Sequence, residues 1–565
     1  MSIKLLIIGG VAGGATAAAR ARRIDERAEI ILFERGEYIS FANCGLPYYI
    51  GDVIKRKDDL LVTTPETVKS RYNIDVRTLS EALKIDREKK EVKIKNHNTG
   101  EVYRESYDKI ILSPGAEPIK PPLEGMDLKN IFNLRNIPDA EKIKATIESI
   151  KPKSAVIVGG GSIGLEMAEN LMVRGVETTT IELLDQVMAP FDYEMASLLH
   201  AHLKEQGIHL ELENGVEKIS QKGDRLLVTT KKGINVECDM VILSIGVRPE
   251  NRLAMEAGLE IGVLGGIRVD GCMRTSDPDI FAVGDAVEVR NFITGIPTIT
   301  ALAGPANKQG RIAADNALGR REVFKGTLGT AIVKVFKMSA ASTGVSEKML
   351  KKNGVPFMVS YTHSGSHASY YPGATMMAIK LIFHPGTGKI LGAQIVGGEG
   401  VDKRIDVLAT AIYGGMTVHD LENLELAYAP PYGSAKDPIN IAGYVASNIL
   451  KGDVDTFYWH QLPDIDPDRH VLVDLRNKDE LETAGKMSGA VHIPLAELRD
   501  RLPEFDRGKT YIPFCAVGLR GYIGHRILIQ NGFKSRNLSG GFKTYMGAEE
   551  KTMKMPPETK LWMSE

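Results

Sequence analysis

The chain has 565 residues, several times the length of a typical single domain, which predicts a multidomain protein. Its 71 Lys and Arg residues nearly balance its 72 Asp and Glu residues, and the formal net charge of −1 argues against a dedicated nucleic-acid-binding protein. Charged residues at 25% and hydrophobic residues at 43% are typical of a globular protein and exclude a disordered, collagenous or coiled-coil chain. No run of about 18 apolar residues occurs, so we expect no contact with a membrane.

The four cysteines are too widely separated for a disulfide scaffold or a CxxC metal site; they are Cys44, Cys238, Cys272 and Cys515. We therefore expect no metal, and reduced thiols in a cytoplasmic protein. The glycines are the more informative residues, because they gather in short clusters.

The first glycine cluster follows an apolar strand predicted over Lys4–Ile8 and precedes an Ala-rich helix. A second strand, Glu29–Phe33, then ends at Glu34. This βαβ pattern is typical of a dinucleotide site, in which the glycine turn admits the pyrophosphate and the acid binds a ribose hydroxyl. The cluster, residues 9–14, departs from the GxGxxG spacing because Val11 stands at the second glycine position.

The same pattern recurs about 150 residues later. A strand at Ala155–Val158 leads into Gly159–Gly164, which has the full GxGxxG spacing, and a strand at Thr178–Ile181 ends at Glu182. Two such patterns, each closed by a glutamate, predict two dinucleotides bound by one chain.

Two further strand-to-turn segments, Tyr107–Ala116 and Thr275–Ala286, complete a set that resembles the flavoprotein disulfide reductases that bind two dinucleotides. The resemblance covers residues 1 to about 447 and implies FAD and NADH as cofactors, with Asp285 bonded to the flavin ribityl chain. The cofactor-binding residues that it implies are Gly9, Gly10, Ala12, Gly13, Gly14, Glu34, Arg35, Asn43, Ala82, Ser113, Gly115, Gly159, Gly161, Ile163, Gly164, Glu182, Gly246, Gly284, Asp285 and Ala303.

The expected fold class is α/β, with two Rossmann-like dinucleotide-binding domains, an α+β dimerisation domain and a rhodanese-like α/β domain. The expected boundaries are 1–115 and 243–325 for a discontinuous FAD-binding domain, 116–242 for the NADH-binding domain, 326–447 for the dimerisation domain, 448–468 for a linker and 469–565 for the rhodanese domain.

Cys44 lies ten residues after the ribose-binding acid, in the segment SFANCGLPYYIG. No second thiol follows it, so its oxidised form must be a mixed disulfide, a persulfide or a sulfenic acid. The segment resembles coenzyme A disulfide reductases more closely than the NADH oxidases and peroxidases, which also use one cysteine. We expect a neighbouring helix N-terminus to favour the Cys44 thiolate.

The resemblance also implies a coenzyme A site. Thr16, Arg20 and Arg23 share one face of the first helix, where arginine would recognise phosphate. The remaining residues implied to bind coenzyme A are Ser40, Asn43, Arg71 and Lys436. Tyr370 and Tyr428 are expected to reach the redox sulfur from the second subunit of a homodimer as catalytic residues, with Tyr371 as the alternative to Tyr370.

The last 100 residues alternate short strands and helices, and Cys515 to Arg520 lie between a strand and a helix. With the segments VDLR, GAVHIP and the pair Gly540-Gly541, they resemble a rhodanese domain. Four residues separate Cys515 from Arg520, one fewer than in phosphatases of related fold, so the loop suits sulfur rather than phosphate. Backbone N–H groups and the helix N-terminus would stabilise a Cys515 thiolate or persulfide.

These features predict an FAD-dependent NADH reductase of coenzyme A disulfide, coenzyme A persulfide or polysulfide, coupled to a rhodanese sulfurtransferase cysteine. Two alternatives stay open: an NADH oxidase or peroxidase that forms a Cys44 sulfenic acid, and an NADH-responsive redox-sensing dimer. The sequence leaves open the physiological sulfur species, the strictness of NADH over NADPH, and whether Cys44 and Cys515 exchange sulfur directly.

Overall fold

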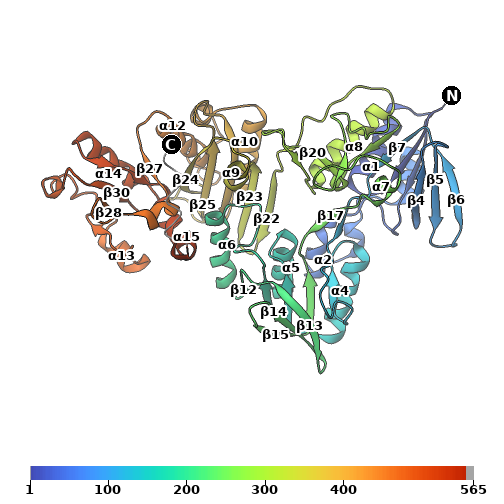
Figure 1. The fold of residues 1–565 in the computed structure, drawn as a ribbon, viewed down its shortest axis with the longest axis horizontal. Helices are drawn as coiled ribbons and strands as arrows, with labels where there is room; N and C mark the ends of the chain where they lie inside the picture. The colour runs from blue at the N-terminus through green and yellow to red at the C-terminus, as the bar shows by residue number, and fades with distance from the viewer. Residues whose placement is uncertain (1, 555–565) are drawn as a thin grey trace. The chain divides into compact units, whose positions relative to one another are not determined.

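The computed structural model describes residues 2–554, so the last eleven residues of the expected rhodanese domain lie outside the described part. The chain forms two compact units (Figure 1). Unit 1 comprises Met1–Asp185 and Gly207–Gly329, and unit 2 comprises Gln186–Gln206 and Thr330–Glu565. Each unit is described by itself below.

The first sheet of unit 1 is parallel and has the order β19-β7-β1-β2-β3. Its strands are β1 (Lys4–Ile8), β2 (Glu29–Phe33), β3 (Asp75–Arg77), β7 (Lys109–Leu112) and β19 (Ile280–Ala282). Helices α1 (Ala12–Ile24) and α8 (Ala303–Ala317) pack against it. An antiparallel sheet adjoins it, formed by β4 (Ser80–Asp86), β5 (Glu91–Asn96) and β6 (Val102–Ser106).

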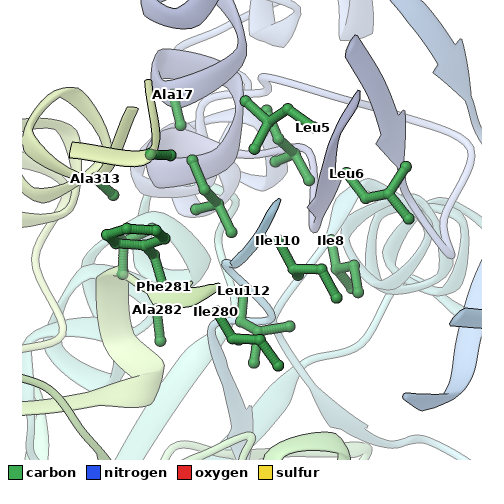
Figure 2. Packing of buried hydrophobic residues seen from close by; sticks show 14 of the residues in the cluster. Leu5, Leu6, Ile8, Ala17, Ile110, Leu112, Ile280, Phe281, Ala282 and Ala313 are labelled. Carbon is green, nitrogen blue, oxygen red and sulfur yellow. The ribbon is translucent and has the colours of Figure 1, made fainter. Parts of the chain in front are cut away.

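The core of this half lies between the sheet and these two helices (Figure 2). Leu5, Leu6 and Ile110 are fully buried, as expected for parallel strands covered on both faces. Ala17 of α1 and Ala313 of α8 leave room for the helices to approach closely. The runs of apolar residues in the sequence therefore correspond to buried parallel strands.

The second sheet repeats this architecture in the order β12-β11-β10-β16-β9. Its parallel strands are β9 (Ile131–Asn133), β10 (Ser154–Val158), β11 (Glu177–Ile181), β12 (His209–Glu211) and β16 (Met240–Leu243). It is accompanied by α4 (Ile137–Ile150) and α5 (Ser162–Val173) and by a meander of β13 (Val216–Lys222), β14 (Arg225–Thr230) and β15 (Asn235–Cys238). The chain enters and leaves this half through β8 (Ala116–Pro118) and β17 (Val247–Pro249), which pair with each other.

Unit 2 contains an antiparallel sheet of order β22-β23-β26-β25-β24. The strands are β22 (Ala331–Val335), β23 (Met338–Gly344), β24 (Met358–Gly365), β25 (Met376–Phe383) and β26 (Ile390–Gly397). Helices α10 (Val401–Tyr413) and α12 (Pro438–Leu450) pack on it, and α11 (Val418–Asn423) packs on α12. Helix α6 (Tyr193–Glu205), which the sequence places among the NADH-binding residues, also belongs to this unit.

The rhodanese-like part of unit 2 has a parallel sheet of order β29-β28-β30-β31. Its strands are β28 (His470–Asp474), β29 (Val491–His492), β30 (Thr510–Phe514) and β31 (Lys534–Ser535), and its helices are α13 (Lys478–Ala484), α14 (Leu519–Gln530) and α15 (Gly541–Lys554). Within the expected linker, β27 (Thr456–Phe457) pairs with β32 (Asn537–Leu538) and η4 (Trp459–Asp464) contacts α15. The expected α/β fold class is confirmed.

Among the helices of residues 2–554, none has the length and apolarity needed to cross a membrane.

The close packing of α1 on α8 gives a stability prediction. A Cβ atom at Gly310 would lie 2.3 Å from the carbonyl oxygen of Gly13, whereas a Cβ at Gly304 on the same helix would meet nothing within 4 Å. We expect Gly310→Ala to lower the free energy of unfolding by about 2 kcal/mol, because the helices must separate. Gly304→Ala is the matched control and should change it little. Thermal unfolding followed by circular dichroism compares the two, and equal stability of both variants would contradict the close approach.

Candidate functional site

Both glycine turns of unit 1 are built in the same way. A Cβ at Gly9 would lie 2.0 Å from the carbonyl oxygen of Ser113, and a Cβ at Gly159 would lie 2.4 Å from that of Ser244. Both glycines have positive φ, +101° and +104°. Only glycine allows the turn to lie this close to the neighbouring strand while adopting this backbone conformation. The N-termini of α1 and α5 are thereby left open to a phosphate group.

The two acids predicted to bind ribose occupy equivalent positions. Glu34 accepts hydrogen bonds from the backbone N–H groups of Gly10 and Gly36, both at 2.8 Å. Glu182 accepts from Gly160 at 2.7 Å and from Leu184 at 2.9 Å. Each carboxylate is therefore fixed at the carboxyl end of its strand, beside the glycine turn. The cradles and acids fit two dinucleotides, as the sequence predicts.

The strand ends beside the turns also match. Ser113 donates its backbone N–H to Ile8 at 2.7 Å, and Ser244 donates to Val158 at 2.8 Å. Gly115 and Gly246 follow with positive φ. Across the first sheet, Gly284 donates to the Gln309 side chain at 2.7 Å. This contact fixes the turn that carries Asp285, whose pKa is raised by burial.

The remaining expected cofactor residues lie in unit 1. Gly13 and Gly14 are buried in α1, Ala82 is buried in β4, and Ala303 is the first residue of α8. Gly161 is the N-cap of α5, and Ile163 is exposed in its first turn. Arg35 pairs with Glu250 at 2.8 Å. Their direct contacts to nucleotides stay a prediction.

Cys44 lies in the short helix η1 (Asn43–Gly45), which leads directly into α2 (Leu46–Ile50). The loop that follows α2 is anchored to the second nucleotide-binding half, because Arg174 pairs with Asp52 at 2.7 Å and donates to the carbonyl oxygen of Ile50 at 3.1 Å. Lys144 of α4 also pairs with Asp52. The segment that carries Cys44 is thus positioned by both halves of unit 1.

The electrostatic environment of Cys44 differs from the expectation of a helix-stabilised thiolate. Partial burial raises the pKa of the Cys44 thiol, and the charges of Glu166 and Asp285 raise it further. Burial also raises the pKa of Glu166 to about 7, against a lowering by the hydrogen bond from Tyr48 at 3.2 Å. Helix α2 has only five residues, and desolvation together with the nearby carboxylates disfavours the thiolate.

Most residues expected to bind coenzyme A lie in unit 1 around α1. Thr16 bonds Asn307 at 2.7 Å, and Arg20 forms a two-point ion pair with Asp315 at 2.7 and 2.9 Å. Arg23 is exposed at the same face. Ser40 and Asn43 flank the cysteine segment, Arg71 is exposed on α3 (Pro65–Tyr72), and Lys436 is exposed in unit 2. Arg20 is therefore already neutralised by an internal partner, which leaves Arg23 as the freer phosphate-binding candidate of the helix.

The two expected catalytic tyrosines come together in unit 2. The hydroxyls of Tyr370 and Tyr428 are hydrogen-bonded at 2.7 Å, and the side chains are 73% and 48% exposed. This hydrogen bond raises the pKa of Tyr370. Tyr371 instead packs edge-on against His367, with ring centroids 5.6 Å apart. The structure therefore pairs Tyr370, rather than Tyr371, with Tyr428.

Cys515 lies at the floor of the loop between β30 and α14 and is 1% exposed. Its sulfur accepts a hydrogen bond from the backbone N–H of Gly518 at 3.2 Å. The N-terminus of α15 holds the loop, because Phe542 and Lys543 donate to the carbonyl oxygens of Cys515 and Ala516 at 2.8 and 3.0 Å. The loop has the form expected for binding sulfur.

Sequence reasoning missed several residues beside these sites. Glu166 contacts Tyr48 of α2, the helix that follows Cys44. Gln309 contacts Gly284 in the turn that carries Asp285. Arg135 donates to Pro114 at 3.4 Å, and burial followed by the charge of Arg35 lowers its pKa. Glu480 pairs with Arg520. Of these residues, Glu166 could have been suspected from the sequence, because it is an acid five residues after Gly161, in the helix that follows the second glycine cluster.

Comparisons with known proteins agree with this geometry. Residues 3–310 match the family model described as pyridine nucleotide-disulphide oxidoreductase, residues 330–437 match its dimerisation domain, and residues 460–548 match the rhodanese-like domain.

Curated relatives cover most of the chain. A coenzyme A disulfide reductase of Staphylococcus haemolyticus is 36% identical over 447 residues, which are 79% of this chain and 100% of the relative. A protein of Methanocaldococcus jannaschii named NADH oxidase is also 36% identical, over 78% of this chain and 98% of the relative.

Two solved structures extend over the rhodanese-like part as well. The reduced CoADR-RHD of Bacillus anthracis is 50% identical, with a TM-score of 0.95, and the match covers 98% of this chain and 99% of the other. An NAD-dependent persulfide reductase from A. fulgidus is 40% identical, with a TM-score of 0.90 and coverage of 96% and 100%. The chain therefore belongs to the pyridine nucleotide-disulphide oxidoreductase family, which implies FAD and NADH as cofactors, and it carries the dimerisation domain of that family and a rhodanese-like domain.

Proposed function

We propose that the protein is an FAD-dependent, NADH-consuming reductase of coenzyme A disulfide, coenzyme A persulfide or polysulfide. The observation that carries this proposal is the placement of Cys44, the exposed one of the four free cysteines, in a segment that bonds the first glycine turn through Ser40 and Gly10 and contacts α5 of the second nucleotide-binding half through α2. Relatives named as coenzyme A disulfide reductases and a persulfide reductase support it. When bound, FAD and NADH would supply the two electrons that reduce a sulfur–sulfur bond.

Cys44 is the proposed attacking group. Its thiolate attacks one sulfur of coenzyme A disulfide, forms a mixed disulfide and releases the other half as a thiolate. Two electrons then break the mixed disulfide and return the Cys44 thiolate together with the second coenzyme A thiolate. Because the nearby carboxylates disfavour a free thiolate, the mixed disulfide is the more stable resting form.

We assign the coenzyme A site to the face of α1 and to the cysteine segment. Arg23 and Arg71 are exposed cations suited to phosphate, and Ser40 and Asn43 flank the reacting sulfur. Lys436, Tyr370 and Tyr428 would be supplied by the second subunit of a homodimer. A hydrogen-bonded phenol pair can donate a proton to the departing thiolate. Coenzyme A should therefore be retained during purification.

We also propose that Cys515 is a sulfurtransferase residue, with Arg520 as its catalytic partner. The buried sulfur and the hydrogen bond that it accepts from the backbone N–H of Gly518 support a persulfide carrier. The corresponding division of the chain is FAD-binding at 1–115 and 243–325, NADH-binding at 116–242, dimerisation at 326–447, connection at 448–468 and sulfur transfer at 469–565. We further propose a cytoplasmic location, because widely separated free thiols suit a reducing compartment.

An NADH oxidase that cycles Cys44 through a sulfenic acid is the second candidate, because one relative bears that name. Turnover on coenzyme A disulfide, persulfide, polysulfide, peroxide and oxygen, measured side by side, distinguishes the two. Faster turnover with oxygen or peroxide than with every sulfur substrate would favour the oxidase.

The first prediction concerns Cys44. Cys44→Ser should retain FAD and its fold but lose NADH-driven reduction of coenzyme A disulfide and persulfide, because no second cysteine lies near position 44 in the sequence to replace it. Steady-state NADH oxidation measures the loss, and Cys272→Ser is the matched control. Turnover above a few per cent in Cys44→Ser would show that another group forms the mixed disulfide.

A second prediction concerns pH. The pKa of Glu166 is about 7, so its carboxyl group is mostly neutral at pH 6 and mostly charged at pH 8. We expect Glu166→Gln to raise the rate at which iodoacetamide alkylates reduced Cys44 by about threefold at pH 8 and to change it little at pH 6, because a repelling charge disappears only at the higher pH. Glu177→Gln, which removes an exposed carboxylate of the same unit, should leave both rates unchanged. An equal effect of Glu166→Gln at both values would contradict this assignment.

The third prediction separates the two cysteines. Cys515→Ser should abolish sulfur transfer from thiosulfate to cyanide and leave NADH-driven reduction of coenzyme A disulfide intact, because that small substrate reaches Cys44 without a carrier. Both activities are measured on the full chain. If Cys515→Ser keeps its flavin but loses coenzyme A disulfide reduction, Cys515 belongs to the reductive cycle and the proposed division of labour is wrong.

A further inference from the structure

The arginine of the rhodanese-like loop is held by a carboxylate from another element. The two terminal nitrogens of Arg520 each donate to one oxygen of Glu480, both at 2.6 Å. Glu480 lies in α13, 40 positions earlier in the sequence, and both side chains are about 30% exposed. This two-point geometry fixes the plane of the guanidinium as well as its position.

The Glu480 carboxylate is also held in place by its own helix. Glu480 occupies the third position of α13, where it accepts a hydrogen bond from the backbone N–H of the N-cap Asn477 at 2.9 Å. The hydrogen bond from Arg520 is the largest effect that lowers the pKa of Glu480, to about 2. Glu480 is therefore a carboxylate at every pH at which sulfur transfer is measured.

Arg520 also interacts electrostatically with Cys515, the sulfur proposed to react. Its pKa is raised first by the hydrogen bond to Glu480 and also by its interaction with Cys515. A second charged pair of the domain is formed by Asp474 and Arg476. A carboxylate oxygen and a guanidinium nitrogen of this pair lie 2.6 Å apart, and both side chains are buried. In these two pairs each guanidinium charge is matched by a carboxylate, and the exposed Lys543, whose backbone N–H bonds Ala516, is a further cation beside the loop.

Resting on the sulfurtransferase role proposed for Cys515, we propose that Glu480 is a positioning residue that also sets donor specificity. Its carboxylate aims Arg520 at the sulfur and cancels the guanidinium charge, so that the loop favours a persulfide donor over a dianion such as thiosulfate. A fully cationic loop would instead attract the dianion.

The two reactions differ in charge but not in bonding. With a persulfide RSSH, the Cys515 thiolate attacks the outer sulfur, a new sulfur–sulfur bond forms, the bond of the donor breaks, and its electron pair leaves with RS⁻. With thiosulfate, the same attack releases sulfite, and the Cys515 thiolate and the reacting group of the donor carry three negative charges, against one when that group is a protonated persulfide. In both reactions the sulfane sulfur changes carrier without any external oxidant or reductant.

The test uses the full-length holoenzyme and three variants. Glu480→Gln removes the charge and keeps the shape, Glu480→Asp keeps the charge but shortens the reach, and Glu482→Gln removes an exposed charge two residues along the same helix as the control. Sulfur transfer to cyanide is measured with thiosulfate and with glutathione persulfide. Alkylation of Cys515 by iodoacetamide at pH 7 is measured in parallel.

We expect Glu480→Gln to lower the KM for thiosulfate, to raise the ratio of kcat/KM for thiosulfate to that for the persulfide by about tenfold, and to speed alkylation of Cys515. Glu480→Asp should lower kcat with both donors and keep the ratio, because only the aim of Arg520 changes. Glu482→Gln should match the unmodified protein in each assay.

An unchanged ratio and alkylation rate in Glu480→Gln, with equal loss of activity for both donors, would overturn the proposal and leave Glu480 a purely structural residue. Cys515→Ser distinguishes this result from failure of the underlying role. If Cys515→Ser still transfers sulfur, the sulfurtransferase assignment itself fails. If it does not, an unchanged donor ratio in Glu480→Gln refutes the inference about Glu480 alone.

Discussion

The two nucleotide-binding halves of unit 1 both depend on a close contact of backbone with backbone at their glycine turns. Gly9 and Gly159 lie against the carbonyl oxygens of Ser113 and Ser244 with no space for a Cβ atom. Because each turn is fixed on the neighbouring strand, the next glycine N–H points at a carboxylate of the adjoining strand, Glu34 or Glu182. The phosphate cradle and the ribose acid of each site therefore depend on one contact. A side chain at that point would displace both.

Cys44 and Cys515 lie in contrasting electrostatic surroundings. Cys44 is exposed, and desolvation of its thiol together with the charges of Glu166 and Asp285 raises its pKa, which disfavours the free thiolate. Cys515 sits under a backbone N–H and beside a guanidinium, in a loop held by the start of α15. A persulfide anion is the species that such a loop stabilises. These surroundings suit the proposed roles of the two sulfurs, which are reduction at Cys44 and storage of sulfane sulfur at Cys515.

The sequence was informative wherever the determinants are local. The strand, glycine turn, helix and closing acid of each nucleotide site fall within about 30 residues, so their spacing predicts the geometry. Residues that reach a site from a distant part of the sequence leave no such spacing pattern. Gln309 is 25 positions from Gly284, and Glu480 is 40 positions from Arg520. The electrostatic setting of Cys44 was also beyond prediction, because α2 is short and Glu166 reaches it from another helix. The α/β fold class and family followed from local patterns, whereas the pKa values required the tertiary structure.

Unit 2 joins segments that the sequence assigns to three different domains, and a buried lysine holds α6 on the dimerisation sheet. Lys380 of β25 is fully buried and pairs with Glu194 of α6 at 2.5 Å, with Glu347 of α9 (Glu347–Lys352) at 2.6 Å and with Asp192 at 3.0 Å. Removing one member of such a cluster leaves unpaired buried charge, which costs about 3–5 kcal/mol. On the same sheet, Tyr458 donates to Val359 at 3.0 Å and His363 bonds Thr544 of α15 at 2.9 Å. The rhodanese-like part is thereby packed on the dimerisation sheet and on α6, so these residues act as one folded body instead of two domains on a flexible tether.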